Sequence, residues 1–272
     1  MKKTSLSMLY LLSLFLPISA CSDDGEYDRV PLMDEANFVK VAINSDTMLL
    51  QDKVRTSSLR GMSVGVFGGS FSVMPASDTL YSTWRRLMKW DISLYGHGGH
   101  GFSSLQGSIQ TQVDSAAVHD IYILWASTND FGGSREVGTP YDYTVYDGYD
   151  ITRLVTQCGG INYCIKALRA KNPAAHLFFF GSARSFFNPA CAVWSSSDHN
   201  ELGYNLASYV NGQMLCCALQ EVPFYDQFHN YPFDGSNYTL YYDEDAMHMN
   251  AQGYSLITYP MLEWILQHGQ NK

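Results

Sequence analysis

The sequence is poor in charge and carries no surplus of positive charge. Charged residues make up 16% of the chain, and 17 Lys and Arg stand against 26 Asp and Glu, for a formal net charge of −9. A nucleic-acid-binding protein needs a basic surface to offset the phosphates, and the sequence contains no basic cluster. Apolar residues make up 46% of the chain, which is too many for a disordered protein. We therefore expect a folded protein without a nucleic-acid partner.

Internal repeats and C-x-x-C pairs are also absent, so the cysteines do not favour a zinc or thioredoxin-like site. Apart from Cys21, the cysteines are Cys158, Cys164, Cys191, Cys216 and Cys217. Cys158 and Cys164 lie close together in the sequence and are the preferred disulfide, provided that the protein is exported. The alternative is that all five are small buried hydrophobic residues. The sequence leaves both interpretations open, because it gives no distance between two thiols.

The N-terminus has the pattern of a secretory signal. Lys2 and Lys3 precede an apolar run over 6–18 that is too short to span a bilayer. Leu16-Pro17-Ile18-Ser19-Ala20-Cys21 follows the order of apolar and small residues before a cysteine, and it resembles the lipobox of bacterial lipoproteins. The resemblance implies removal of residues 1–20 and a membrane anchor on lipidated Cys21. An ordinary signal peptide with a chance cysteine is the alternative.

An acidic stretch follows Cys21, and residues 21–37 are expected to form a solvated tether. An outer membrane lipoprotein of a Gram-negative bacterium would fit this arrangement, facing either the periplasm or the cell surface. Residues 38–60 are interpreted as an N-terminal addition packed on the domain. Residues 61–272 are expected to form that domain, since the chain is too short for two large cores.

Four apolar runs, at 63–67, 91–95, 121–126 and 176–180, are expected to form strands. Their hydrophobicity is continuous and not alternating, which indicates strands covered on both faces and therefore a parallel sheet. Helical patterns lie between and after them. The first begins near Ile161 and ends before Pro173, the second extends over 202–219, and the third follows a cap at Asn250. The alternation of strands and helices predicts an α/β fold.

Three unusual polar stretches directly follow predicted strands, where ligands bind in parallel α/β sheets. They are Gly68-Gly69-Ser70, the glycine- and histidine-rich segment 96–101, and Ser127-Thr128-Asn129-Asp130. The glycines permit tight turns and a close approach of backbone N–H groups. The two histidines of 96–101 have no carboxylate or thiol nearby in the sequence, so no metal is expected.

Asp245 and His248 lie just ahead of the last predicted helix. A three-residue separation within a helical turn lets the carboxylate orient the imidazole, whose other nitrogen is then available to a nucleophile. Together with Ser70 they supply the groups that acyl transfer requires. Ser70, Asp245 and His248 are therefore the predicted catalytic residues.

These stretches together resemble the four sequence blocks of the SGNH/GDSL hydrolase superfamily. Gly68-Gly69-Ser70 resembles its Gly-Asp-Ser block, Ser127-Thr128-Asn129-Asp130 its Gly-x-Asn-Asp block, and Asp245-Ala246-Met247-His248 its Asp-x-x-His block. Gly99 matches the glycine of the remaining block, with Gly96, Gly98 and Gly101 as alternatives. Gly69 replaces the usual Asp, and Ser127 replaces the usual Gly.

The resemblance implies a three-layer α/β/α sandwich with a mainly parallel, flavodoxin-like sheet and no cofactor. It also implies that Ser70, Gly99 and Asn129 donate hydrogen bonds to the oxyanion. The implied function is a serine esterase or acyl hydrolase, acting on an acylated small molecule or glycan. The preferred substrate is an O-acetyl group on carbohydrate, and the alternative is an inactive carbohydrate-binding surface lipoprotein. The tyrosine-rich segment 131–150 is interpreted as a lip of the site or as a packed insertion.

Overall fold

Five parallel strands form the centre of the computed structural model, which describes residues 50–144, 154–186, 199–230, 233 and 235–269. The strands are β1 (Ser63–Gly68), β2 (Asp91–Leu94), β3 (Ile121–Trp125), β4 (His176–Phe180) and β5 (Phe224–Tyr225). Their order in the sheet is β2-β1-β3-β4-β5, and every neighbouring pair is parallel. This is the flavodoxin-like order. The α/β fold class expected from the sequence is therefore confirmed.

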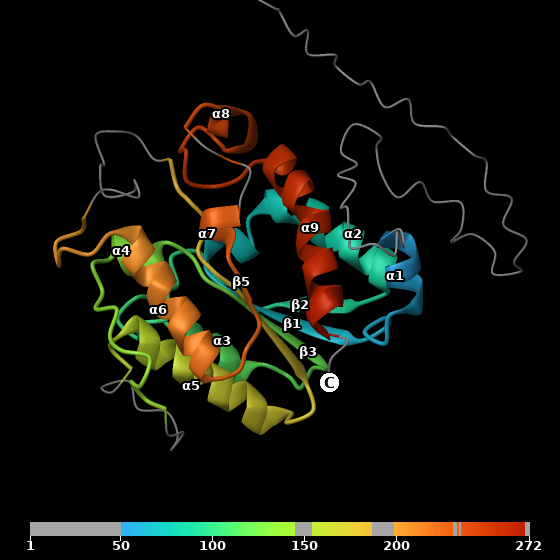
Figure 1. Ribbon diagram of the computed structural model, residues 1–272, viewed down its shortest axis with the longest axis horizontal. Helices are drawn as coiled ribbons and strands as arrows, with labels where there is room; N and C mark the ends of the chain where they lie inside the picture. The colour runs from blue at the N-terminus through green and yellow to red at the C-terminus, as the bar shows by residue number, and fades with distance from the viewer. Residues whose placement is uncertain (1–49, 145–153, 187–198, 231–232, 234, 270–272) are drawn as a thin grey trace, which may run out of the picture. The chain divides into compact units, whose positions relative to one another are not determined.

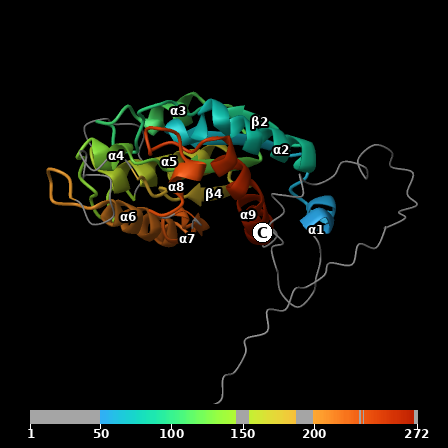
Figure 2. The same ribbon diagram turned by 90° about the horizontal axis from the view of Figure 1, so that it is seen from above.

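Helices cover both faces of the sheet and make the three layers (Figure 1). They are α1 (Leu50–Thr56), α2 (Asp78–Met88), α3 (Ile109–Ser115), α4 (Asn129–Gly132), α5 (Gln157–Lys171), α6 (Leu206–Leu219), α7 (Gln227–Asn230), α8 (Tyr238–Tyr241) and α9 (Ala251–Gly269). Short 3-10 helices lie at Ser70–Ser72 and Pro75–Ser77. Seen from above, α2 and α3 lie near β2, whereas α6 and α7 lie at the opposite edge (Figure 2).

The strands are apolar throughout because each face of the sheet has its own core. On β3, Tyr122 and Leu124 point into a core formed with α3, α5 and α6. Ile121 and Ile123, which alternate with them, point into a second core formed with α1, α2 and α9. All four side chains are fully buried, and burial of such a side chain contributes about 1.5–3 kcal/mol. The continuous apolar runs of the sequence are thus explained by two buried faces.

Caps set the helix starts, and two starts differ from the expected ones. The Thr156 hydroxyl accepts a hydrogen bond from the Gly159 N–H, so α5 begins before the expected apolar pattern. The Asn205 side chain accepts one from the Ser208 N–H, so α6 begins at Leu206 and not at Leu202. Asn250 caps α9 through the Gly253 N–H, as predicted. Helices α2 and α3 lie where no helix was predicted.

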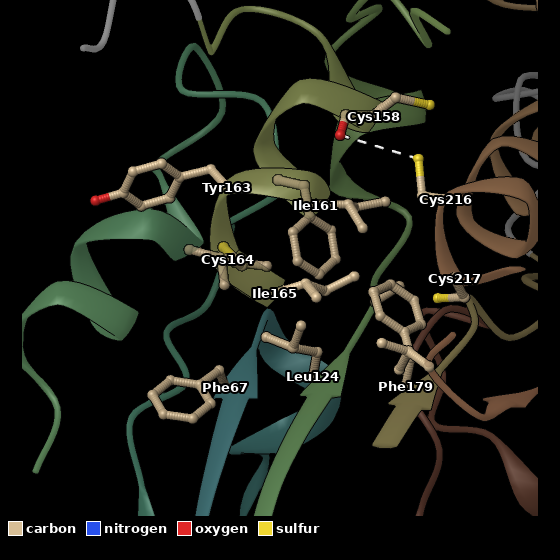
Figure 3. Close-up of a cluster of buried hydrophobic side chains, with 14 of the residues drawn as sticks. Phe67, Leu124, Cys158, Ile161, Tyr163, Cys164, Ile165, Phe179, Cys216 and Cys217 are labelled. Atoms are coloured by element: carbon tan, nitrogen blue, oxygen red, sulfur yellow. Dashed lines mark hydrogen bonds between the residues drawn. The ribbon is translucent and has the colours of Figure 1, made fainter. Parts of the chain in front are cut away.

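The preferred disulfide between Cys158 and Cys164 is absent, and both residues are free buried thiols. They lie six positions apart on α5, about 9 Å along the helix axis, too far for a bond between them. Cys216 and Cys217 are also free and buried on α6, and the Cys216 Sγ lies 3.9 Å from the Cys158 carbonyl oxygen (Figure 3). Burial raises the pKa of the Cys164 and Cys217 thiols well above the ordinary value. The alternative of buried hydrophobic cysteines holds for these four, and Cys191 lies outside the described residues.

The expected signal peptide, Cys21 and the 21–37 tether also lie outside the described residues. The described part of the 38–60 segment contains α1, which contacts α2 and α9. Lys53 on α1 forms an ion pair with the buried Glu263 on α9, with Nζ and Oε1 3.0 Å apart. Within the part of the chain that the structure describes, no helix has the length and apolar character needed to span a bilayer.

Candidate active site

Ser70, Asp245 and His248 lie together in the structure although 178 positions separate Ser70 from His248. The His248 Nε2 lies 2.8 Å from the Ser70 Oγ. The His248 Nδ1 lies 2.5 Å from the Asp245 Oδ2. An ionised carboxylate can only accept, so Nδ1 carries the proton and Nε2 presents a lone pair to the Ser70 hydroxyl. This arrangement can remove a proton from Ser70.

The segment that carries Ser70 is held by two helices. Gly68 ends β1, and the chain turns at Gly69 into the 3-10 helix Ser70–Ser72. The Tyr81 hydroxyl on α2 donates to the Ser72 carbonyl over 2.8 Å, and the Tyr254 hydroxyl on α9 donates to the Phe71 carbonyl over 2.7 Å. Both tyrosines are fully buried. Ser70 is therefore fixed from the α2 and α9 side of the sheet.

Asp245 and His248 lie in a tight turn and not in the helical turn expected from their spacing. Ala246 has φ of 52°, in the left-handed region, which breaks any helix there. The Asp245 Oδ1 accepts the N–H groups of Met247 and His248 over 2.8 and 2.9 Å. Partial burial acts to raise the pKa of Asp245, but the hydrogen bonds from His248 and Met247 outweigh it and hold this pKa below the ordinary value. Asp245 thus stays an acceptor for the imidazole.

Asn129 begins α4 and contacts the loop after β2, which contains Gly99. The Asn129 Nδ2 donates one hydrogen bond to the His100 carbonyl over 2.9 Å. The His97 N–H donates to the Gly68 carbonyl over 3.0 Å, which holds the other end of the 97–100 loop against the Ser70 turn. Among the described residues, no acceptor is found for the N–H groups of Ser70 and Gly99. The Asn129 Nδ2 lies directly beside the Ser70 turn, since a Cβ at Gly69 would lie 2.8 Å from it.

The alternative glycines of the second block have different surroundings. A Cβ at Gly96 would lie 2.1 Å from the Ser72 Oγ, and one at Gly101 would lie 2.4 Å from the Asp130 Oδ1. Gly96 and Gly101 are therefore required for packing. Gly98 and Gly99 face open space, and only Gly99 of this pair has a positive φ, of 81°.

Solved structures with this architecture were found, although no protein-family model and no curated relative match the sequence. A Chitinophaga pinensis protein described as a possible lipase has a TM-score of 0.59 and 19% identity, over 76% of this chain and 99% of that one. Candidate GDSL-like lipases from Bacteroides ovatus and Bacteroides uniformis have TM-scores of 0.52 and 0.51 and identities of 13% and 15%. They cover 78% and 74% of this chain, and 99% and 94% of their own. The chain has the SGNH/GDSL hydrolase fold.

Gln112 supports the turn that carries Ser70, and the sequence did not predict this role. Its side-chain amide pairs with the backbone of Gly68. The Oε1 accepts the Gly68 N–H and the Nε2 donates to the Gly68 carbonyl, each over 3.0 Å. The same Nε2 lies 3.1 Å from the His100 Nδ1. Burial is the main cause that lowers the pKa of His100, and the neighbouring His97 is the second. The ring therefore stays neutral and accepts a hydrogen bond from Gln112. Gln112 lies on α3, which the sequence did not predict, so no sequence signal could have identified it.

Asp130 follows Asn129 in the sequence, and it organises the loop between β2 and α3. Its carboxylate is fully buried and accepts the N–H groups of Phe102 and Ser103 over 2.8 and 2.9 Å. Burial raises the pKa of Asp130 to about 6, against the opposing effect of these two hydrogen bonds. Its position next to Asn129 was the only sequence signal for this role.

The described part of the 131–150 segment supports the packed-insertion interpretation. The Tyr143 ring lies 5.8 Å from the Tyr163 ring on α5, and the Asn162 Nδ2 on α5 donates to the Asp142 carbonyl over 2.7 Å. Tyr141 is exposed. Tyr146 and Tyr149 lie outside the described residues.

The raised pKa of Asp130 predicts a pH effect on stability. The pKa of Asp130 in the folded protein, about 6, exceeds the ordinary 3.8. The contribution of Asp130 to the free energy of unfolding is therefore fully present below about pH 4 and is lost as the pH rises through about 6. Relative to Asp130→Asn, the free energy of unfolding of the wild type should fall by about 3 kcal/mol over this range. Denaturant unfolding of both proteins at several pH values measures the difference. A pH-independent difference would contradict the expectation.

Proposed function

We propose that this protein is a serine esterase or acyl hydrolase. The observation that carries the proposal is the Nε2 of His248 at 2.8 Å from the Ser70 Oγ, with Nδ1 held by Asp245. A serine hydroxyl becomes a nucleophile when such a base accepts its proton. A broken triad would favour an inactive carbohydrate-binding protein, and the assembled one favours the enzyme.

In the proposed reaction, the Ser70 Oγ bonds to the acyl carbon while its proton passes to the His248 Nε2. The carbonyl π electrons move to the oxygen, which accepts hydrogen bonds from the Ser70 and Gly99 N–H groups and the Asn129 amide. Collapse of this tetrahedral intermediate breaks the bond between the acyl carbon and the alcohol oxygen, and the alcohol leaves with the proton from Nε2. Water, deprotonated by the same imidazole, then releases the acid and restores Ser70. Asp245 stabilises the imidazolium in both steps.

The preferred substrate is an O-acetyl group on carbohydrate. Its support is a half-buried aromatic pair next to the Asp245–His248 turn. The rings of Phe186 and Tyr238 stack with centroids 5.0 Å apart, and the Phe186 N–H donates to the Ala246 carbonyl over 2.8 Å. Aromatic faces of this kind suit the apolar face of a sugar ring. The proposal includes a membrane anchor at Cys21, on the sequence pattern alone.

The test is covalent labelling with a fluorophosphonate, which needs an activated serine but no knowledge of the substrate. The wild type should be labelled on the peptide that contains Ser70, and Ser70→Ala should not be labelled. Ser82→Ala, which removes an exposed hydroxyl on α2, is the matched control and should label like the wild type. Equal labelling of Ser70→Ala, or none of the wild type, would refute an active serine hydrolase.

A further inference from the structure

The two departures from the SGNH/GDSL pattern, Gly69 and Ser127, lie face to face in the structure. A Cβ at Gly69 would lie 2.7 Å from both the Cβ and the Oγ of Ser127, and 2.8 Å from the Nδ2 of Asn129. Cβ atoms in proteins essentially never lie within 3.0 Å of such atoms, so one of the two side chains would have to move. The Ser127 side chain therefore occupies the space that a side chain at position 69 would need.

The Ser127 hydroxyl also holds Asn129. It donates to the His100 carbonyl over 3.1 Å and accepts the Asn129 N–H over 3.3 Å. The Asn129 Nδ2 donates to the same carbonyl over 2.9 Å. Backbone and side chain of Asn129 are thus both held relative to His100, and one Nδ2 hydrogen has no acceptor among the described residues. That hydrogen can reach a substrate oxygen.

The surroundings of Ser127 make it rigid. The residue is buried, and its carbonyl accepts a hydrogen bond from the buried Ser182 hydroxyl over 2.7 Å. The Gln213 Nε2 on α6 donates to that same Ser182 Oγ over 2.9 Å. Ser127 therefore cannot turn aside at low cost to admit a side chain at position 69.

We propose that Gly69 and Ser127 are a matched pair in which Ser127 is the positioning residue for the Asn129 amide. The inference rests on the proposed function, because the amide is then an oxyanion donor. One side chain fits between the two loops, and in this chain it comes from position 127 and not from position 69. Gly69 is required next to Ser70 because the Ser127 side chain already fills the space.

The experiment is a double-mutant cycle with Gly69→Asp, Ser127→Gly and the double variant, assayed on a short-acyl ester. Gly69→Asp displaces Asn129 and should lower kcat by about 100-fold, the typical cost of losing one oxyanion donor. Ser127→Gly removes the hydroxyl and should lower kcat by about tenfold with KM unchanged. The double variant again has one side chain in the shared space but lacks the Ser127 hydroxyl, so it should recover to about the level of Ser127→Gly, whereas independent effects would multiply to a loss of about 1000-fold.

Unfolding temperatures give a second readout that needs no activity. Gly69→Asp should lower Tm by about 5 °C through overpacking, and the double variant should lie close to the wild type. Gly235→Asp is the matched control, since a Cβ there meets no atom within 4 Å, and it should change neither kcat nor Tm.

The outcomes separate this inference from the proposed function. A wild type that is inactive and unlabelled by fluorophosphonate refutes the proposed function, while the unfolding temperatures still test the pair. An active wild type whose Gly69→Asp variant is equally active and stable overturns the pairing. Independent, multiplicative losses in the double variant overturn it as well.

Discussion

Replacing His248 with alanine is expected to lower kcat for a short-acyl ester by about 10⁴-fold or more, the range seen when a triad member is removed. The reason is that the Ser70 hydroxyl then has no base within hydrogen-bonding reach in the described structure, where the His248 Nε2 lies at 2.8 Å. The remaining oxyanion donors would support only residual turnover. Steady-state kinetics of purified wild type and variant measure the loss.

The chain offers a close control for this experiment. His229 repeats the local geometry, with its Nδ1 2.7 Å from the Asp226 Oδ2 and its N–H donating to the Asp226 Oδ1 over 3.0 Å. It has the same three-residue spacing from its carboxylate, yet no serine partner among the described residues. His229→Ala should therefore keep wild-type kcat. If His248→Ala also kept it, His248 would not be the base.

Replacing Asn129 with alanine is expected to lower kcat by about 10²- to 10³-fold, with KM much less affected. The amide would act on charge that develops only in the transition state, so its loss should appear in kcat. Asn129→Asp should be impaired at least as much, because a carboxylate cannot donate and would repel an oxyanion. Kinetics on the same ester measure both variants.

Asn172 supplies the matched control for this substitution. Its Nδ2 donates to the His119 carbonyl over 2.9 Å, the same length as the bond from Asn129 to His100. It lies just before β4, at the end of the sheet opposite to Ser70. Asn172→Ala should lower Tm about as much as Asn129→Ala and leave kcat unchanged. Equal effects of the two variants on kcat would show that Asn129 acts only through stability.

The amino-acid sequence determined the elements whose patterns are local. The continuous apolar runs at 121–126 and 176–180 specified β3 and β4, because strands covered on both faces need apolar residues at every position. Asn250 specified the start of α9, since a cap acts within three residues. The resemblance of the short blocks then nominated Ser70, Asp245 and His248, which the structure brings together.

The tertiary structure decided everything that depends on contacts between distant segments. The conformation of the Asp245–His248 turn follows from the left-handed Ala246, and spacing alone suggested a helix. Cys158 faces Cys216 and not its neighbour Cys164, because α5 and α6 pack side by side.

Gln112 reaches the Gly68 backbone from a helix without a clear sequence pattern. Gly69 and Ser127 look like unrelated departures in the sequence, and only the fold shows that they compete for one space. Local patterns reflect neighbours along the chain, whereas these contacts exist only after the sheet has formed.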